Sequence, residues 1–295
     1  MFHKGMRILD LCIVIGLAFP AQSVADDQRD KELANRSPYE VDLALDLPVT
    51  FGAGVVSLVP ELVKSELGGP WCGLSCDPSG LNGLDRKVLG NHSSGARIAS
   101  DALVISGMVL PHLAGLLDAL ISKPSDGWGG YAKDSLVLIE TLAVSFSVNQ
   151  VVKYAVRRPR PFVYDATLMD TERTTPDAAL SFYSGHTSTV FCMATAYSYT
   201  FTKRHPNSPL VIPVWLATHA LAATTGVLRV EAGKHFWTDV LAGAAIGSTI
   251  GFLVPYLHTA NRSETTAGDS KTQQLGVALG PAFFEHGLGL GITIH

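Results

Sequence analysis

Five apolar segments, each long enough to form a helix, fill most of the chain after residue 99. They cover residues 100–121, 134–156, 186–202, 209–228 and 239–257. The last segment has no charged residue from Val240 to Leu257, which is nearly the length that crosses a bilayer. Others contain polar residues such as Asp101, His112 and Glu140. The pattern predicts an all-α fold, a bundle of about five or six helices that is either embedded in a membrane or packed on itself.

The composition limits the kind of protein to which this bundle belongs. Hydrophobic residues make up 47% of the 295 residues and charged residues 16%, and the mean hydropathy is +0.24. This is too apolar for a disordered chain, but less apolar than most proteins built wholly of membrane spans. The formal net charge of −4 offers no positive field for nucleic acid, so no nucleic-acid partner is expected. No pattern in the sequence indicates an oligomeric state.

Residues 1–25 have the pattern of an export signal. Lys4 and Arg7 precede an apolar run over residues 11–19, and small residues up to Ala25 offer a cleavage site before two aspartates. An uncleaved signal anchor is the alternative. In both cases we expect the chain after residue 25 outside the cytoplasm, in a bacterial cell envelope.

Residues 26–98 are expected to form an N-terminal extracytoplasmic segment with a short helix and a loop. Apolar and polar residues alternate over residues 41–47, which predicts a short strand, and residues 51–64 are apolar but too short to cross a membrane. Cys72 and Cys76 flank a short loop and are candidates for a disulfide, with two unpaired thiols as the alternative. No second Cys or His pair follows at zinc-ligand spacing, so no metal site is expected.

Residues 99–258 are expected to form the bundle domain, and residues 259–295 a linker with a Gly-rich hairpin, so that strand-like segments are expected at both termini. Counting crossings from an external N-terminal segment puts the loops 122–133 and 203–206 inside. The three stretches described next would then lie outside, on the same side as residues 26–50.

The first of these stretches lies where a helix is expected to end. Pro159 and Pro161 stop the helix, and Lys153 and Arg160 flank its last turn and exit. Two such cations can bind the oxygens of a phosphoryl group, because Arg presents a planar fork of donors and Lys a point charge. A simple positively charged helix end explains this stretch equally well.

The second stretch, Ser184 to Ser188, precedes an apolar helix. Gly185 lets the backbone approach an anion closely, and the amides of a helix start point toward that anion. His186 would then lie beside the bound group as a proton donor. A plain N-cap at Ser184 with a solvated His186 is the alternative.

The third stretch contains Arg229, His235 and Asp239. His235 and Asp239 are four residues apart and share a helix face. Asp239 can accept the proton of one ring nitrogen, which leaves the other nitrogen free to attack. Arg229 can return to the same pocket across a turn marked by Gly233. A surface His–Asp pair is the alternative.

The order of the three stretches favours one interpretation. Together they resemble the phosphatidic acid phosphatase type 2 and vanadium haloperoxidase superfamily over residues 100–257. Two supporting positions differ from the family pattern: Tyr183 stands where Pro is usual, and Leu228 where Ser is usual. The second difference removes one phosphate contact.

The resemblance implies a metal-independent phosphatase that needs no cofactor. It implies His235 as the nucleophile that forms a phosphohistidine, Asp239 as the residue that orients it, and His186 as general acid and then base. The phosphate-binding residues that it implies are Lys153, Arg160, Ser184, Gly185 and Arg229.

The leading expectation is a membrane enzyme with a periplasm-facing site. It would hydrolyse a phosphomonoester or pyrophosphate, and a lipid is the favoured kind of substrate. Three alternatives remain: a soluble periplasmic acid phosphatase, a vanadate-dependent haloperoxidase, and a non-catalytic envelope protein. Phosphatidic acid, phosphatidylglycerophosphate, isoprenyl pyrophosphate and lipid A all remain open as substrates.

Overall fold

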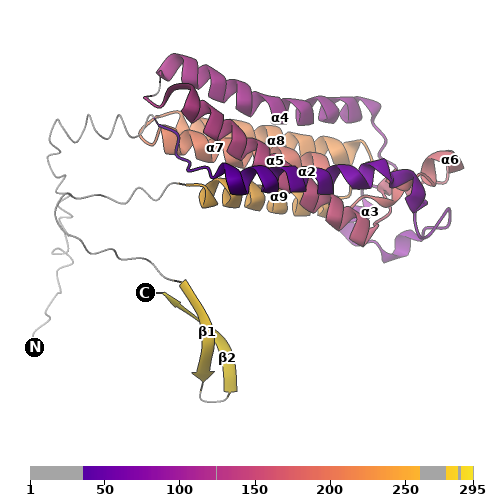
Figure 1. Ribbon diagram of the computed structural model, residues 1–295. Coiled ribbons are helices and arrows are strands. Elements are labelled where there is room, and N and C mark those ends of the chain that lie inside the picture. The colour runs from indigo at the N-terminus through magenta and orange to yellow at the C-terminus, as the bar shows by residue number, and fades with distance from the viewer. Residues whose placement is uncertain (1–35, 124, 260–276, 285–286, 295) are drawn as a thin grey trace, which may run out of the picture. The chain divides into compact units, whose positions relative to one another are not determined.

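The computed structural model describes residues 36–123, 125–259, 277–284 and 287–294. The expected export signal at residues 1–25 lies outside these ranges. Within them, six long helices run side by side and confirm the expected all-α bundle (Figure 1). The six helices are α2 (Leu43–Leu62), α4 (Ser94–Ser122), α5 (Gly127–Val156), α7 (Gly185–Arg204), α8 (Val211–Glu231) and α9 (Trp237–Leu257).

Short elements gather at the end of the bundle where α2 and α5 finish, in the loops after α2 and after α5 (Figure 1). They are η1 (Lys64–Leu67), η2 (Pro78–Gly80), α3 (Gly83–Arg86), η3 (Pro161–Tyr164), α6 (Asp170–Arg173) and η4 (Pro176–Ala179). The two loops contact each other: Arg173 donates to the Leu74 carbonyl oxygen at 2.9 Å, and Cys76 packs on the cluster around Phe162. Cys72 and Cys76 are joined in a disulfide at this end.

Helix α2 corrects two expectations about the N-terminal region. The strand predicted over residues 41–47 is wrong, because Asp42 caps a helix that begins at Leu43. The apolar stretch is therefore 20 residues long and not too short to cross a membrane. Helix α2 packs along α5.

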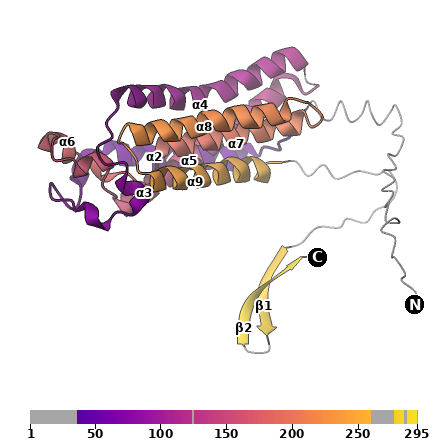
Figure 2. The same ribbon diagram turned by 180° about the vertical axis from the view of Figure 1, so that it is seen from behind.

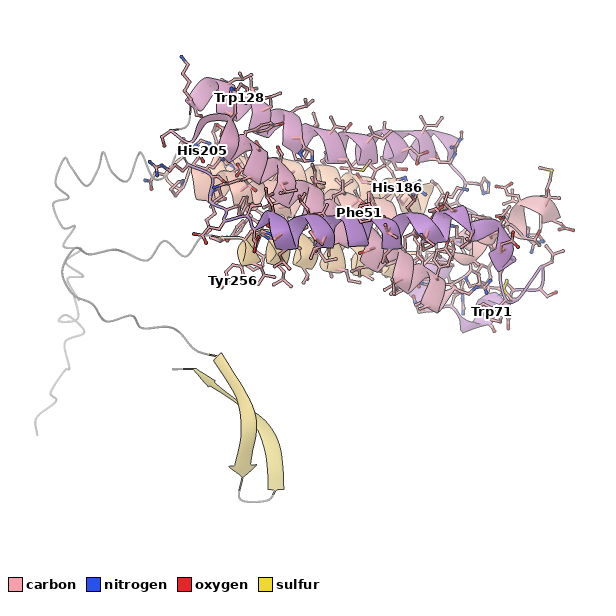
Figure 3. All side chains as sticks on the ribbon, in the orientation of Figure 1. Phe51, Trp71, Trp128, His186, His205 and Tyr256 are labelled. Atoms are coloured by element: carbon pink, nitrogen blue, oxygen red, sulfur yellow. A yellow bond between two sulfur atoms is a disulfide. The ribbon has the colours of Figure 1, made fainter. Side chains whose placement is uncertain are left out.

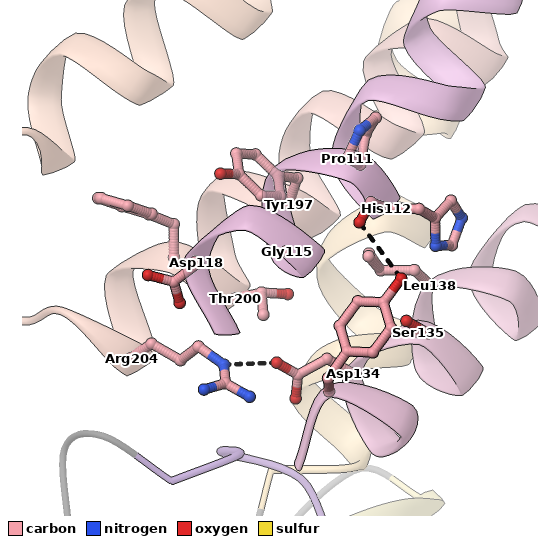
Figure 4. A pocket seen from close by; sticks show the side chains of 12 residues that line it. Pro111, His112, Gly115, Asp118, Asp134, Ser135, Leu138, Tyr197, Thr200 and Arg204 are labelled. Carbon is pink, nitrogen blue, oxygen red and sulfur yellow. Dashed lines mark hydrogen bonds and ion pairs between the residues drawn. The ribbon is translucent and has the colours of Figure 1, made fainter. Parts of the chain in front are cut away.

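The start of α2 is tied to the end of the bundle opposite the short elements. The amide of Ser37 donates to Asp126 at 2.7 Å, and Tyr39 forms a β-bridge with Thr259. A small cavity with both polar and apolar lining residues lies at the same end, where Arg204 pairs with a carboxylate of α5 (Figure 4). The N-terminal residues described here therefore do not lie on the side of the three motif stretches, as the crossing count had it, but opposite them.

Five helical stretches are long and apolar enough to cross a membrane. They are α2, α4, Gly127–Tyr164, α8 and α9. Many of their apolar side chains point away from the bundle; Phe51 on α2, for example, is 75% exposed (Figure 3). The bundle thus has the length and outer surface of a membrane-spanning domain.

The sixth helix, α7, is the exception, because it contacts α4, α5, α8 and α9 and is buried along most of its length (Figure 2). Its polar side chains bond to its neighbours: Ser188 to Ser145 of α5 at 3.3 Å, and Ser198 to Thr218 of α8 at 2.9 Å. Helix α7 has fewer apolar residues than any of the other five helices, and polar contacts inside the bundle help to hold it in place.

Glycines let α9 approach α7 closely. A β-carbon added at Gly243 would lie 2.8 Å from the Ser184 carbonyl oxygen, and the corresponding positions at Gly247 and Gly251 are tighter still. Small residues at this four-residue spacing allow two helix backbones to come together. The start of α7 and the start of α9 are therefore held in one fixed relation.

The C-terminal residues form a unit of their own after Ala260. Strands β1 (Val277–Phe284) and β2 (Gly287–Ile294) pair antiparallel, with Val277 opposite Ile294. The turn residues expected at 285 and 286 lie outside the described residues.

Candidate active site

The three motif stretches meet at the end of the bundle that carries the short elements. Lys153 lies in the last turn of α5, and His186 in the first turn of α7. Arg229 lies in the last turn of α8, and His235 directly before α9. Because α5 and α8 run toward this end while α7 and α9 start from it, four chain segments bring their polar ends together (Figure 1).

His235 is 1% exposed, and each of its two ring nitrogens lies near a hydrogen-bonding group. Its Nδ1 lies 2.8 Å from the Ser181 carbonyl oxygen, and its Nε2 lies 3.3 Å from Nη1 of Arg160. A carbonyl only accepts, so Nδ1 carries the proton and Nε2 keeps a lone pair. Burial, reinforced by Arg160 and Arg229, holds the pKa of His235 well below 6.5. The side chain is therefore a neutral imidazole with Nε2 available for attack.

Asp239 contacts His235 less directly than the sequence suggests. Its Oδ2 is 3.8 Å from Nδ1 of His235, beyond hydrogen-bond reach. The same oxygen accepts from the Ser181 hydroxyl at 2.5 Å and from the Phe236 amide at 2.9 Å. Asp239 thus holds the residues on both sides of His235, and the direct partner of the imidazole is the Ser181 carbonyl.

Arg158, which lies between the motif positions Lys153 and Arg160, joins Asp239 to Asp85. It donates to Asp239 through Nη1 and to Asp85 through Nη2 at 2.8 Å, and its guanidinium lies 4.3 Å from the centre of the Phe236 ring. Asp85 is completely buried and also accepts from the Thr238 hydroxyl at 2.6 Å. This arrangement fixes the start of α9 against the loop that follows α2.

Arg160 lies 4% exposed beside His235 and is fixed by two acceptors. It donates to the Lys234 carbonyl oxygen at 3.0 Å and to Asp177 at 3.0 Å. Asp177 also pairs with Lys64 at 3.1 Å. Although burial acts to raise the pKa of Asp177, Arg160 and Lys64 hold it well below its usual value. A carboxylate therefore lies against the guanidinium that the family resemblance assigns to phosphate.

Gly185 lies where no side chain fits. An added β-carbon would be 2.9 Å from Oδ1 of Asn149 and 3.4 Å from Nζ of Lys153. The neighbouring Ser184 caps α7, because its hydroxyl accepts from the Thr187 amide. The Ser184 hydroxyl is itself buried and lies 2.9 Å from the Thr187 hydroxyl.

His186 and Arg229 share a partner that the motifs do not contain. Oδ1 of Asp101, on α4, lies 2.9 Å from Nε2 of His186 and 3.1 Å from Nη1 of Arg229. The Nε of Arg229 is buried with no hydrogen-bond partner among the described residues. The one sequence signal for Asp101 was a charge within an otherwise apolar segment.

A cavity of about 390 Å³ opens beside these groups, between α2, α4, α5 and α7. Its polar lining consists of Ser57, Glu61, Asn149, Gln150, Lys153, Gly185, His186 and Thr189. Its apolar lining consists of Leu58, Val104, Met108 and Phe146. The cavity thus joins part of the polar site to an apolar region between the helices.

The described geometry agrees with comparisons to known proteins. The model of the PAP2 superfamily matches residues 134–263. Phosphatidylglycerophosphatase B of Bacillus subtilis is 30% identical over 122 residues, which are 41% of this chain and 56% of that protein. Lipid A 1-phosphatase of Porphyromonas gingivalis is 38% identical over 143 residues, 46% of this chain and 27% of that protein. This chain therefore spans at most somewhat over half the length of these relatives.

One solved structure was also found, the crystal structure of a transmembrane PAP2 type phosphatidylglycerolphosphate phosphatase from Bacillus subtilis. It aligns with a TM-score of 0.42 and 18% identity over 72% of this chain and 94% of that one. The similarity to the PAP2 superfamily thus covers residues 134–263, and this range contains all three motif stretches that meet at one end of the bundle.

Proposed function

We propose that this protein is a metal-independent phosphatase that removes a phosphoryl group from a phosphorylated lipid. The observation that carries the proposal is the cavity of about 390 Å³ with Lys153 and His186 on its polar side and Leu58 and Phe146 on its apolar side. Its size is that of a small-molecule site. A lipid can present its phosphate to the polar groups while its chain stays among apolar side chains.

In the proposed first step, Nε2 of His235 attacks phosphorus. The N–P bond forms as the ester P–O bond breaks, and His186 gives a proton to the departing oxygen. In the second step, His186 takes a proton from water while the water oxygen bonds to phosphorus and the N–P bond breaks. The burial and neutral state of His235 support its role as nucleophile.

Positive groups would stabilise the transition state. Arg160 lies within 3.3 Å of His235, and Lys153 and Arg229 are close enough for their charges to act on it. With the amides at the start of α7, which Gly185 leaves open, they can bind the equatorial phosphoryl oxygens, where negative charge is spread. These cations supply the charge stabilisation for which other phosphatases use metal ions.

We further propose that the site faces the periplasm. The disulfide between Cys72 and Cys76 lies at the site end, and such bonds persist in oxidising compartments. Six crossings then put residues 36–42 and the end of α9 on the cytoplasmic side. This arrangement differs from both expectations for residues 1–25, because a cleaved signal and an uncleaved anchor would each put residues 36–42 outside the cytoplasm.

The test is phosphate release from lipid phosphates and from glycerol phosphate, with EDTA present throughout. We expect release from lipid phosphates by the wild-type protein and none by the His235→Gln variant. The matched control is His219→Gln, because His219 lies on α8 and bonds to the Trp215 carbonyl, not to the site. A faster reaction with glycerol phosphate would favour the acid phosphatase alternative. Activity that requires added divalent metal, or full activity of His235→Gln, would refute the mechanism.

A further inference from the structure

Asp101 lies outside the three motif stretches and outside residues 134–263, yet it reaches the site. Helix α4 packs against both α7 and α8, so its second turn faces the start of one and the end of the other. The Asp101 side chain is 44% exposed on its other side. It therefore lies at the edge of the site, where it contacts two candidate catalytic groups and borders solvent.

One carboxylate oxygen of Asp101 connects these two groups. Oδ1 is 2.9 Å from Nε2 of His186 and 3.1 Å from Nη1 of Arg229, and the neighbouring Ser100 hydroxyl is 3.2 Å from the same Nη1. Oδ2 lies 3.7 Å from Arg97. Both contacts to Oδ1 have the length of N–H···O hydrogen bonds.

The contact decides which ring nitrogen of His186 can react. A carboxylate only accepts, so Nε2 of His186 must carry a proton in the bond to Asp101. His186 lines the cavity together with Lys153 and Gly185. Its other ring nitrogen, Nδ1, makes no hydrogen bond to any of the described residues. Nδ1 is then the atom that can give a proton to a leaving group and later take one from water.

The charges around His186 make the carboxylate more important. Burial, together with the nearby cations Arg229 and Lys153, lowers the pKa of His186 to about 4, because each of them disfavours a protonated imidazole. Asp101 is the acid that bonds to His186 and favours its charged form. To act as an acid, His186 must carry a proton on each ring nitrogen and is then positively charged. Without the Asp101 carboxylate, only cations would lie near this charge.

We propose that Asp101 is a positioning residue for phosphate-ester cleavage: it binds Nε2–H of His186 and Nη1 of Arg229 together and directs Nδ1 of His186 at the leaving oxygen. The inference rests on the proposed function. In the first step the Nδ1 proton goes to the leaving oxygen as the P–O bond breaks and the N–P bond to His235 forms. In the second, Nδ1 takes a proton from water as oxygen replaces nitrogen on phosphorus.

The test compares two leaving groups in Asp101→Asn and in a matched control. An alkyl phosphate needs a proton on its leaving oxygen, whereas p-nitrophenolate departs without one. We expect kcat/KM, which reports on the first step, to fall about 100-fold for the alkyl phosphate, the usual contribution of a general acid, and much less for p-nitrophenyl phosphate. The control is Asp118→Asn. Asp118 is a carboxylate on the same helix at the other end of the bundle (Figure 4), and its Oδ1 lies 3.0 Å from Nε2 of His205. It should leave both rates unchanged.

A double-variant measurement separates the outcomes. In a His186→Asn background, Asp101→Asn should cause no further loss with the alkyl phosphate, since the two residues act as one unit. Equal loss for both substrates, no loss, or full additivity would overturn the inference. If Asp101→Asn does not purify folded, Asp101→Glu makes the same comparison, because one added methylene moves the carboxylate while keeping its charge. A wild-type protein inactive on both substrates would refute the proposed function instead.

Discussion

The contact between Gly243 of α9 and the Ser184 carbonyl allows a sharp test of how the bundle positions its site. In Gly243→Ala, the new methyl would lie 2.8 Å from that oxygen, about 0.6 Å inside ordinary contact, which begins near 3.4 Å. Two helix backbones cannot yield as a flexible side chain can, so α7 and α9 must move apart. Overpacking of this kind costs about 1–3 kcal/mol of stability.

The same displacement would separate the two histidines that we propose to be catalytic. His186 begins α7 and His235 precedes α9, so spreading the helix starts lengthens the gap across which phosphoryl transfer must occur. A misplacement of about 1 Å can cost about 100-fold in rate, and we expect roughly tenfold or more in kcat for this smaller shift.

The assay combines phosphate release with thermal unfolding in detergent. The control is Gly54→Ala on α2, where an added β-carbon meets nothing within 4 Å. There we expect unchanged activity and equal or slightly higher stability, because Ala favours a helix over Gly. Wild-type activity and stability in Gly243→Ala, or an equal loss in Gly54→Ala, would refute the argument that close backbone contact sets the site geometry.

Two further predictions concern the charge and the orientation of the site. Asp177→Asn removes the carboxylate that pairs with Arg160 and Lys64. Inorganic phosphate should then inhibit the enzyme roughly tenfold more strongly, which corresponds to a gain of about 1.4 kcal/mol in its binding free energy. Weaker inhibition would mean that Asp177 instead helps Arg160 and Lys64 to bind phosphate. A membrane-impermeant maleimide added to the periplasm should label Lys87→Cys, which lies at the site end of the bundle. The same reagent should label Ser125→Cys, at the opposite end, only after the inner membrane is opened. The reverse pattern of labelling would show the opposite orientation in the membrane.

The helices after residue 99 were predictable because each has an apolar run of helical length. Helix α2 was not, because the alternation from Val41 to Leu47 spans too few residues to separate a strand from a helix. A helix surrounded by lipid also has apolar residues on several sides: Leu43, Leu45 and Leu47 are all about half exposed or more. The alternation of apolar and polar residues therefore did not indicate which side of α2 packs against the bundle.

The motifs predicted which residues gather at the site but not what holds them. His186 and Asp101 are 85 residues apart in the chain, and Arg160 and Asp177 are 17 apart. Such pairs depend on how α4 and the loop after α5 pack, and an isolated aspartate in a sequence does not reveal its partner. The same is true of the Ser181 carbonyl, because a backbone group leaves no signature in residue type.

The polar character of α7 has a consequence for how the protein is made. A helix whose Ser and Thr side chains find their partners on α5 and α8 gains little by entering lipid alone. It can enter the bilayer only in company with those neighbours, and α8 and α9 are synthesised after it. His186 would therefore reach its place in the candidate site at the close of membrane insertion, and a chain whose synthesis stops early would lack the assembled site.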